Sequence, residues 1–194
     1  MGGVIAYPSS ECVASLARGS RSIGRKSTTC SSVPSSDITL QGVSKRPFII
    51  SEYVRWGDVD LAGIICYGAY IRFFELAETE LFRAARLPFG EMFERFDMWL
   101  PRKVMHTEFH APAVLDQHLK VVTYISHVGN TSLKINFDVL GGDGATLHAT
   151  AHQVLVCVGR SDLKKRPLPP ALIELLEPFT MTPADARSAA AANV

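Results

Sequence analysis

Two aspartates separated by one residue precede the most clearly helical part of the chain, in the stretch WGDVDLAGIICYGAY (residues 56–70). A carboxylate such as that of Asp60 can act as a nucleophile or as a general base on water. The first turn of a helix presents unpaired backbone N–H groups and the positive end of the helix dipole, which stabilise an oxyanion as it forms. Gly63 permits a close backbone approach or a positive φ angle. The stretch therefore contains the parts needed to attack a carbonyl group.

The same pattern also has a structural interpretation. An Asp-x-Asp pair ahead of a helix commonly forms a turn or an N-cap, and short motifs occur by chance. We assign this role, capping or orienting the loop, to Asp58, with a supporting part at most in the chemistry. Cys66 lies beside the predicted site, but no histidine near it in the sequence is placed to activate its thiol. We therefore interpret Cys66 as a small apolar filler.

The elements that position these residues follow from the hydrophobic periodicity. Alternating residues predict a strand over residues 48–56, and apolar residues at helical spacing predict a long helix over residues 68–86. Four further strands and a short terminal helix are predicted at residues 99–111, 120–128, 133–139, 146–158 and 169–176. This order predicts an antiparallel sheet with one helix on its face. Because one helix covers only one face, we expect the other face or the sheet edge to contact a second subunit.

The two ends of the chain depart from this pattern. Residues 1–45 are rich in Ser, Gly and Arg without a sustained period, and we predict a disordered extension. It is interpreted as a flexible tail or a misassigned start, with an organelle transit peptide as the second choice. Residues 46–180 form the predicted domain. Residues 181–194 end in an alanine-rich stretch and are predicted to be a flexible tail.

Composition narrows the function classes. The 194 residues are 47% hydrophobic, which is enough for a core, and the net charge of +1 gives no general attraction to nucleic acid or to an anionic membrane. No apolar run has the length of a membrane span. The four cysteines contain no Cys-x-x-Cys pair, which argues against a disulfide framework or a zinc knuckle. We therefore predict a cytoplasmic protein, with organelle import through the N-terminal segment as the alternative.

The segment RWGDVDLAGIICYGAYIRFFELAETELFR (residues 55–83) resembles the motif of the hotdog-fold acyl-CoA thioesterases of the 4-hydroxybenzoyl-CoA thioesterase type. In that family an Asp-x-Asp-x-x-Gly run leads through two branched apolar residues into a helix with the pattern Tyr-x-x-[Phe/Trp]. The match is ungapped, and the strand order downstream to residue 158 agrees with it. The resemblance implies an α+β hotdog fold, in which an antiparallel β-sheet wraps around one long central α-helix.

The resemblance also implies roles for individual residues. Asp60 would be the catalytic carboxylate, and the backbone N–H of Tyr67 would polarise the thioester carbonyl, with Gly63 in the loop between them. Asp60 would either attack the thioester to give an anhydride or act as a base on water, and the sequence leaves both routes open. Many members have Asn where this chain has Ala69, so a polar contact of the family is missing. The implied substrate is an aromatic or fatty acyl-CoA, hydrolysed by a homodimer or homotetramer without a metal or redox cofactor.

Other charged residues are weaker candidates. Coenzyme A carries phosphates, and we predict that they bind a basic cluster formed by Arg160, Lys164, Lys165 and Arg166, for which a solvated charge run is the alternative. Another branch of hotdog thioesterases uses a helix glutamate, but Asp60 already fills that role here. We interpret the three helix glutamates as a solvated or salt-bridged face: Glu75, Glu78 and Glu80. Two histidine pairs spaced four apart, His106/His110 and His148/His152, lack a Cys or carboxylate to complete a set, so we predict no metal site.

Two functions from other classes remain as alternatives. A hotdog acyl-thioester dehydratase uses His with Asp or Glu in a different motif, and the Asp-x-Asp-x-x-Gly stretch argues against it. A non-catalytic acyl-CoA-binding hotdog module would keep the fold and lose turnover. Release of free CoA distinguishes both from a thioesterase.

Overall fold

The computed structural model describes residues 44–192, and nearly all of the predicted N-terminal extension lies outside this range. The elements are, in chain order, β1 (Phe48–Tyr53), a 3-10 turn (Trp56–Asp58), α1 (Ala69–Ala84), α2 (Phe89–Arg95), β2 (Met98–Trp99), β3 (Arg102–Phe109), β4 (His118–Val128), β5 (Ser132–Gly141), β6 (Leu147–Val156), β7 (Val158–Gly159), α3 (Pro170–Leu176), a second 3-10 turn (Glu177–Phe179) and α4 (Pro183–Ala191). The long helix and the strands therefore form where the periodicity predicts them.

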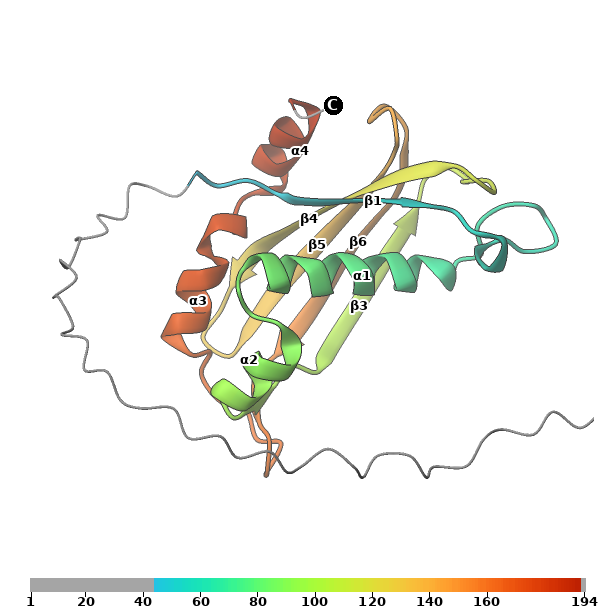
Figure 1. The fold of residues 1–194 in the computed structure, drawn as a ribbon. Coiled ribbons are helices and arrows are strands. Elements are labelled where there is room, and N and C mark those ends of the chain that lie inside the picture. Colours follow the sequence, from blue (N-terminus) through green and yellow to red (C-terminus); the bar gives the residue numbers. More distant parts are fainter. Residues whose placement is uncertain (1–43, 193–194) are drawn as a thin grey trace, which may run out of the picture. The chain divides into compact units, whose positions relative to one another are not determined.

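Five strands form one antiparallel sheet in the order β1-β4-β5-β6-β3, and the short strands β2 and β7 pair separately. Tight turns join β4 to β5 and β5 to β6, whereas β3 pairs with β6 and not with its successor β4. The segment between β3 and β4 therefore carries the chain from one edge of the sheet towards the other (Figure 1). The prediction of an antiparallel sheet with a helix across its face is confirmed.

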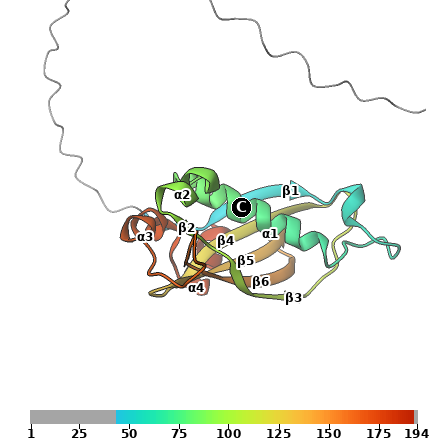
Figure 2. The same ribbon diagram turned by 90° about the horizontal axis from the view of Figure 1, so that it is seen from below.

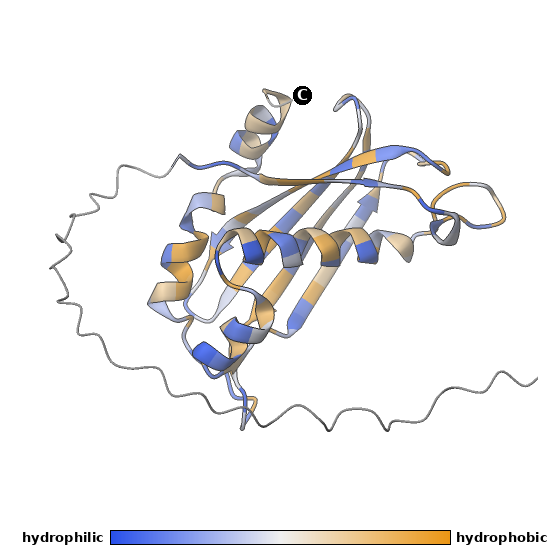
Figure 3. Cartoon of the chain, in the orientation of Figure 1, coloured by the Kyte–Doolittle hydropathy of each residue, from blue (hydrophilic) through white to orange (hydrophobic). Residues whose placement is uncertain are grey.

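Helix α1 packs across one face of this sheet (Figures 1 and 2). Apolar and polar residues alternate around its axis (Figure 3), and the buried side belongs to the main core, with the Phe74 and Phe137 ring centroids 4.9 Å apart. The helix ends at Ala84, and Arg86 just beyond it takes a positive φ of 60° and donates its N–H to the carbonyl of Arg83. Leu87 then donates to the carbonyl of Phe82, which completes a Schellman cap ahead of Pro88.

Two helices were not predicted from the sequence. Helix α2 follows Pro88 directly, and helix α4 occupies residues 183–191, within the predicted flexible tail. Thr182 caps α4 by accepting the N–H of Asp185, and Pro183 stands in its first turn. Ala186 and Ala190 are buried with β4 residues on the face opposite α1. Small residues at i and i+4 look like low complexity in sequence, yet they allow close packing on a sheet. Within residues 44–192 no helix is long and apolar enough to cross a membrane.

Candidate active site

The loop ahead of α1 is anchored through Asp58, which is 6% exposed. Its carboxylate accepts the N–H of Arg55 at 2.8 Å and two hydrogen bonds from the guanidinium of Arg72, in the first turns of α1. Its carbonyl accepts the N–H of Cys66 at 2.7 Å. Burial alone would raise the pKa of Asp58, but the hydrogen bonds and charges of Arg72 and Arg55 outweigh it and hold the pKa below its ordinary value. These contacts tie the loop to the start of α1 through Asp58.

Asp60 stands at the start of a tight turn and is exposed. Its Oδ1 accepts the N–H of Ala62 at 2.8 Å, its carbonyl accepts the N–H of Gly63, and its own N–H donates to Ile64. Gly63 has a φ of 73°, in the left-handed region that favours glycine. The turn therefore fixes the backbone on both sides of the Asp60 carboxylate.

A cleft of about 470 Å³ opens beside this turn. Its lining combines the loop, the start of α1 and the end of β3, through Asp60, Ile64, Ile65, Tyr67, Tyr70, Phe109, His110, Ala111 and Pro112. The rings of Tyr70 and Phe109 lie 5.2 Å apart, and burial raises the pKa of Tyr70. The cleft thus contains both residues that the resemblance implies for chemistry, one as a carboxylate and one at the start of a helix.

The backbone at the start of α1 is suited to binding an anion. The N–H of Ala69 donates to the carbonyl of Cys66, whereas the N–H groups of Tyr67 and Gly68 find no acceptor within residues 44–192. A helix of 16 residues follows, and its dipole adds positive potential at this end. The Tyr67 side chain itself is 78% exposed. Ala69, where the family pattern has a polar residue, is not part of the cleft lining.

The chain also matches known proteins. A family model described as the thioesterase-like superfamily matches residues 54–176. The chain belongs to the thioesterase-like superfamily. It is 29% identical over 120 residues to the acyl-CoA thioester hydrolase YbgC of Escherichia coli O6:H1, covering 62% of this chain and 88% of YbgC.

Two solved structures show the same fold. One is a 1,4-dihydroxy-2-naphthoyl-CoA thioesterase from Synechocystis, with a TM-score of 0.63 and 22% identity over 67% of this chain and 95% of that one. The other is a Staphylococcus aureus protein in complex with CoA, with a TM-score of 0.64 and 16% identity over 70% of this chain and 85% of that one. The predicted hotdog fold and the predicted thioesterase family are confirmed.

The residues that line the cleft from the end of β3 were not identified from the sequence. Phe109, the last residue of β3, and His110, which follows it, line the cleft more than 40 positions after Asp60. From the sequence, His110 was considered only as a metal ligand and that role was rejected; in the structure its Nε2 lies 2.9 Å from the hydroxyl of Thr150. Nothing in the local sequence marks either residue, because their place depends on β3 pairing with β6.

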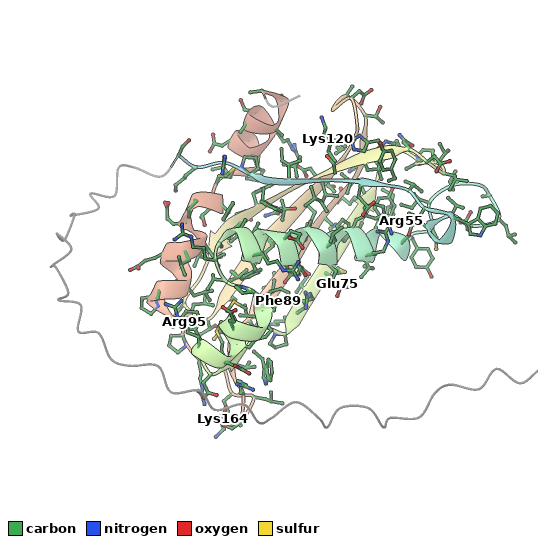
Figure 4. All side chains as sticks on the ribbon, in the orientation of Figure 1. Arg55, Glu75, Phe89, Arg95, Lys120 and Lys164 are labelled. Atoms are coloured by element: carbon green, nitrogen blue, oxygen red, sulfur yellow. The ribbon has the colours of Figure 1, made fainter. Side chains whose placement is uncertain are left out.

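The basic cluster is not beside Asp60 in a single chain. It surrounds the turn after β7, and Figure 4 shows Lys164 far from Arg55, which begins the Asp60 loop. Arg166 lies 3.5 Å from carboxylate oxygens of Asp97 and Asp162, and the Arg160 guanidinium lies 4.9 Å from the centre of the Trp99 ring. The two lysines of the cluster are exposed.

The helix glutamates differ among themselves. Glu80 pairs with Arg83 on the surface, as predicted for a salt-bridged face. Glu78 instead is 1% exposed, and its Oε2 accepts from Arg102 at 2.6 Å and from Gln153 at 2.5 Å. Burial raises the pKa of Glu78, and these two partners offset the effect only in part. Glu78 is therefore salt-bridged, as one of the two predicted interpretations has it, but it is not solvated, because β3 and β6 cover it.

The histidines are arranged differently from their sequence pairs. His106 on β3 lies opposite His152 on β6, with ring centroids 5.3 Å apart. Across residues 44–192, no three His, Cys, Asp or Glu side chains are grouped to hold a metal ion.

Proposed function

We propose that the protein hydrolyses the thioester of an aromatic or fatty acyl-CoA, with Asp60 as the nucleophile or general base. The observation that carries this proposal is the shared cleft, which Asp60 and Tyr67 both line at the start of α1. The acyl-CoA thioester hydrolase activity named for YbgC supports the reaction class. The complex of the Staphylococcus aureus protein with CoA supports the substrate class.

On the general-base route, Asp60 takes a proton from water, and the water oxygen adds to the thioester carbon. The carbonyl electrons move onto its oxygen, which the free N–H of Tyr67 stabilises. When the carbonyl re-forms, the C–S bond breaks, and the CoA thiolate takes the proton from Asp60. On the covalent route the Asp60 carboxylate adds directly, CoA leaves, and water hydrolyses the resulting anhydride. A rapid-quench burst of CoA ahead of free acid indicates the covalent route.

The Asp60→Asn variant tests the proposal. Asparagine keeps an oxygen that accepts the N–H of Ala62 but provides neither a nucleophile nor a base. We expect kcat for CoA release, followed with a thiol reagent, to fall by about 10³-fold or more. Asp143→Asn is the matched control, because Asp143 is also exposed and accepts the N–H of Ala145 at 3.0 Å in a turn with a positive-φ glycine. Near-normal activity in the Asp60 variant would exclude this mechanism.

A panel of acyl-CoA substrates tests the remaining alternatives. Thioesterase activity releases CoA from at least one aromatic or fatty acyl-CoA. A dehydratase changes the acyl group without releasing CoA, and a binding module binds acyl-CoA without turnover. The same panel identifies the preferred acyl group.

We also propose a homodimer built on β3, with a homotetramer as the larger assembly. This strand is exposed at a sheet edge and presents apolar side chains at Val104, Met105 and Phe109. Two copies related by a two-fold axis pair such an edge antiparallel. The Arg102 end of one copy then lies beside the Phe109 end of the other, so the basic cluster of the second copy approaches the cleft.

Sedimentation of the full chain tests this assembly. Met105→Glu adds like charges near the two-fold axis, and we expect it to shift the protein to monomers and to reduce activity. Ser51→Glu is the control, because Ser51 is exposed on β1, at the opposite edge of the same sheet. For CoA binding by the cluster, Lys164→Ala with Lys165→Ala is expected to raise KM. An unchanged KM would leave the cluster as a solvated charge run.

We propose the cytoplasm as the compartment of this protein. Fractionation of cells that express the full chain would test this.

A further inference from the structure

A tyrosine of α1 is almost completely buried and still lines the Asp60 cleft. Tyr70 is 2% exposed, and it belongs to the lining at the start of the helix. Its ring packs among three others, with centroids 5.2 Å from Phe109, 6.3 Å from Phe74 and 6.4 Å from Phe73. Because helical side chains lean towards the N-terminal end of their helix, a ring in the first turn points towards the loop ahead of it. These contacts fix the ring in the wall of the cleft.

The hydroxyl of Tyr70 has no hydrogen-bond partner within residues 44–192. In this range the unpaired side-chain atoms that are sealed from solvent are Thr123 Oγ1 and Asn136 Nδ2. The Tyr70 oxygen is unpaired but not sealed, so a molecule in the cleft can reach it. Burial raises the pKa of Tyr70, so the phenol stays protonated at neutral pH and can donate or accept a hydrogen bond.

The rest of the buried lining offers no other polar side chain. Besides Tyr70, the buried or half-buried lining residues are all apolar: Ile64, Ile65 and Ala111. Asp60, Tyr67 and His110 are polar, but they are exposed. A hydrocarbon group packed against this wall would leave the phenol desolvated and unpaired, whereas a group that carries an oxygen at this point would pair with it.

We propose that Tyr70 is a specificity-determining residue, whose hydroxyl binds an oxygen substituent of the acyl group in the cleft. The inference rests on the proposed function, because the acyl group is that of the acyl-CoA substrate. The protein then selects a hydroxyl-bearing acyl group over the hydrocarbon group of the same shape. The contact is the same whether an aromatic ring or an alkyl chain carries the hydroxyl.

Matched pairs of substrates test the inference and distinguish these two sources. Benzoyl-CoA is compared with 3-hydroxybenzoyl-CoA and 4-hydroxybenzoyl-CoA, and hexanoyl-CoA with 6-hydroxyhexanoyl-CoA, by kcat/KM for CoA release. We expect the parent protein to prefer a hydroxylated substrate over its hydrocarbon counterpart. Tyr70→Phe should lower this preference roughly five- to tenfold, the loss of one hydrogen bond between neutral groups. The pair that shows the effect identifies an aromatic or a chain-like acyl group.

Tyr124→Phe is the matched control. Tyr124 is also 2% exposed, and burial raises its pKa as it does that of Tyr70. It packs with Ala186 and Ala190 on the sheet face opposite α1, away from the cleft. Each change removes one oxygen and keeps the ring, so both variants should fold, which circular dichroism confirms. The substrate preference of Tyr124→Phe should equal that of the parent protein.

The ratio of kcat/KM within a pair separates specificity from other roles of the Tyr70 hydroxyl. A preference that Tyr70→Phe retains would overturn the inference, as would a parent protein without preference in either pair. An equal loss of kcat/KM with every substrate would assign the hydroxyl to the chemistry or to the fold, and would also overturn it. If no substrate releases CoA, the proposed function fails, and calorimetric affinities of the same pairs for the parent protein and Tyr70→Phe decide the inference by the same criterion.

Discussion

The carboxylate of Asp58 is held by the guanidinium of Arg72, 14 positions later, with Nε donating to Oδ1 at 3.1 Å and a second nitrogen donating to Oδ2. Arg72 belongs to α1, whereas Asp58 belongs to the loop that carries Asp60. The pair therefore fixes the loop to the helix that begins two residues after Tyr67, which lines the cleft. We propose that Asp58 acts on the chemistry by positioning Asp60 relative to Tyr67.

We expect the Asp58–Arg72 pair to be strongly coupled. Asp58→Asn leaves Arg72 without a charged acceptor and should lower the free energy of unfolding by about 2 kcal/mol, since hydrogen bonds to charged groups contribute about 1.5–3 kcal/mol. Urea unfolding of Asp58→Asn, Arg72→Met and the double variant measures the coupling. The surface pair Glu80–Arg83 is the control and should couple by less than about 1 kcal/mol. Strictly additive effects at Asp58 and Arg72 would contradict the anchoring role.

Titration of the Asp58 carboxylate should contribute to the pH dependence of the free energy of unfolding. The pKa of Asp58 is lower in the folded protein than its ordinary value of 3.8, so the unfolded chain takes up its proton first. Its contribution is therefore present above about pH 4 and is lost as the pH falls through the folded pKa. Unfolding free energies measured from pH 6 down to pH 3 should fall less steeply in Asp58→Asn than in the parent protein. Parallel curves would show that Asp58 does not titrate differently on folding.

Gly63 should contribute through its backbone alone. A Cβ added at Gly63 would meet nothing within 4 Å, so the cost of Gly63→Ala is that of holding alanine at a φ of 73°, about 1 kcal/mol. Gly90→Ala is the matched control: it is equally unobstructed, lies in α2 and has no positive φ, so it should stabilise by up to about 1 kcal/mol. Thermal or urea unfolding compares them. Equal effects from the two changes would contradict the strained-turn explanation.

The loop that carries Asp60 was predictable because its determinants are local. The Asp-x-Asp pair, Gly63 and the helix start lie within a dozen residues, and turn chemistry with hydrophobic period determines their arrangement. The partner of Asp58 was not predictable, because Arg72 lies 14 positions later in the sequence. Its role depends on the loop folding back over the first turns of α1.

The rest of the site depends on contacts between distant segments. Phe109 reaches the cleft because β3 pairs with β6 at the sheet edge, a choice that strand propensity does not determine. Glu78 is buried for the same reason, since Arg102 and Gln153 come from those two strands. Ala186 and Ala190 of α4 can likewise be identified as packing residues only when the sheet face that they contact is known.

Ionisation of Glu78 should lower the free energy of unfolding. Its pKa is raised in the folded protein, so the folded state holds its proton more tightly than the unfolded chain, and stability falls as the pH rises through the two pKa values. Glu78→Gln keeps an oxygen for Arg102 and Gln153 and removes this dependence. The unfolding free energy of the variant relative to the parent protein should therefore be higher at pH 8 than at pH 4. CoA release should be retained, and its loss would give Glu78 a part in the chemistry.

The backbone role of Tyr67 can be separated from its side chain. Tyr67→Ala removes the exposed ring but keeps the N–H, so activity should be largely retained. Tyr67→Pro removes the N–H, and Tyr67 has no positive φ and makes no backbone hydrogen bond within residues 44–192 that proline would break. Loss of one oxyanion donor lowers kcat by about 10²–10³-fold. Measured kcat values for the two variants decide between a backbone role and a side-chain role of Tyr67, and circular dichroism confirms that both variants are folded. If Tyr67→Ala loses as much activity as Tyr67→Pro, the ring contributes and the backbone assignment is wrong.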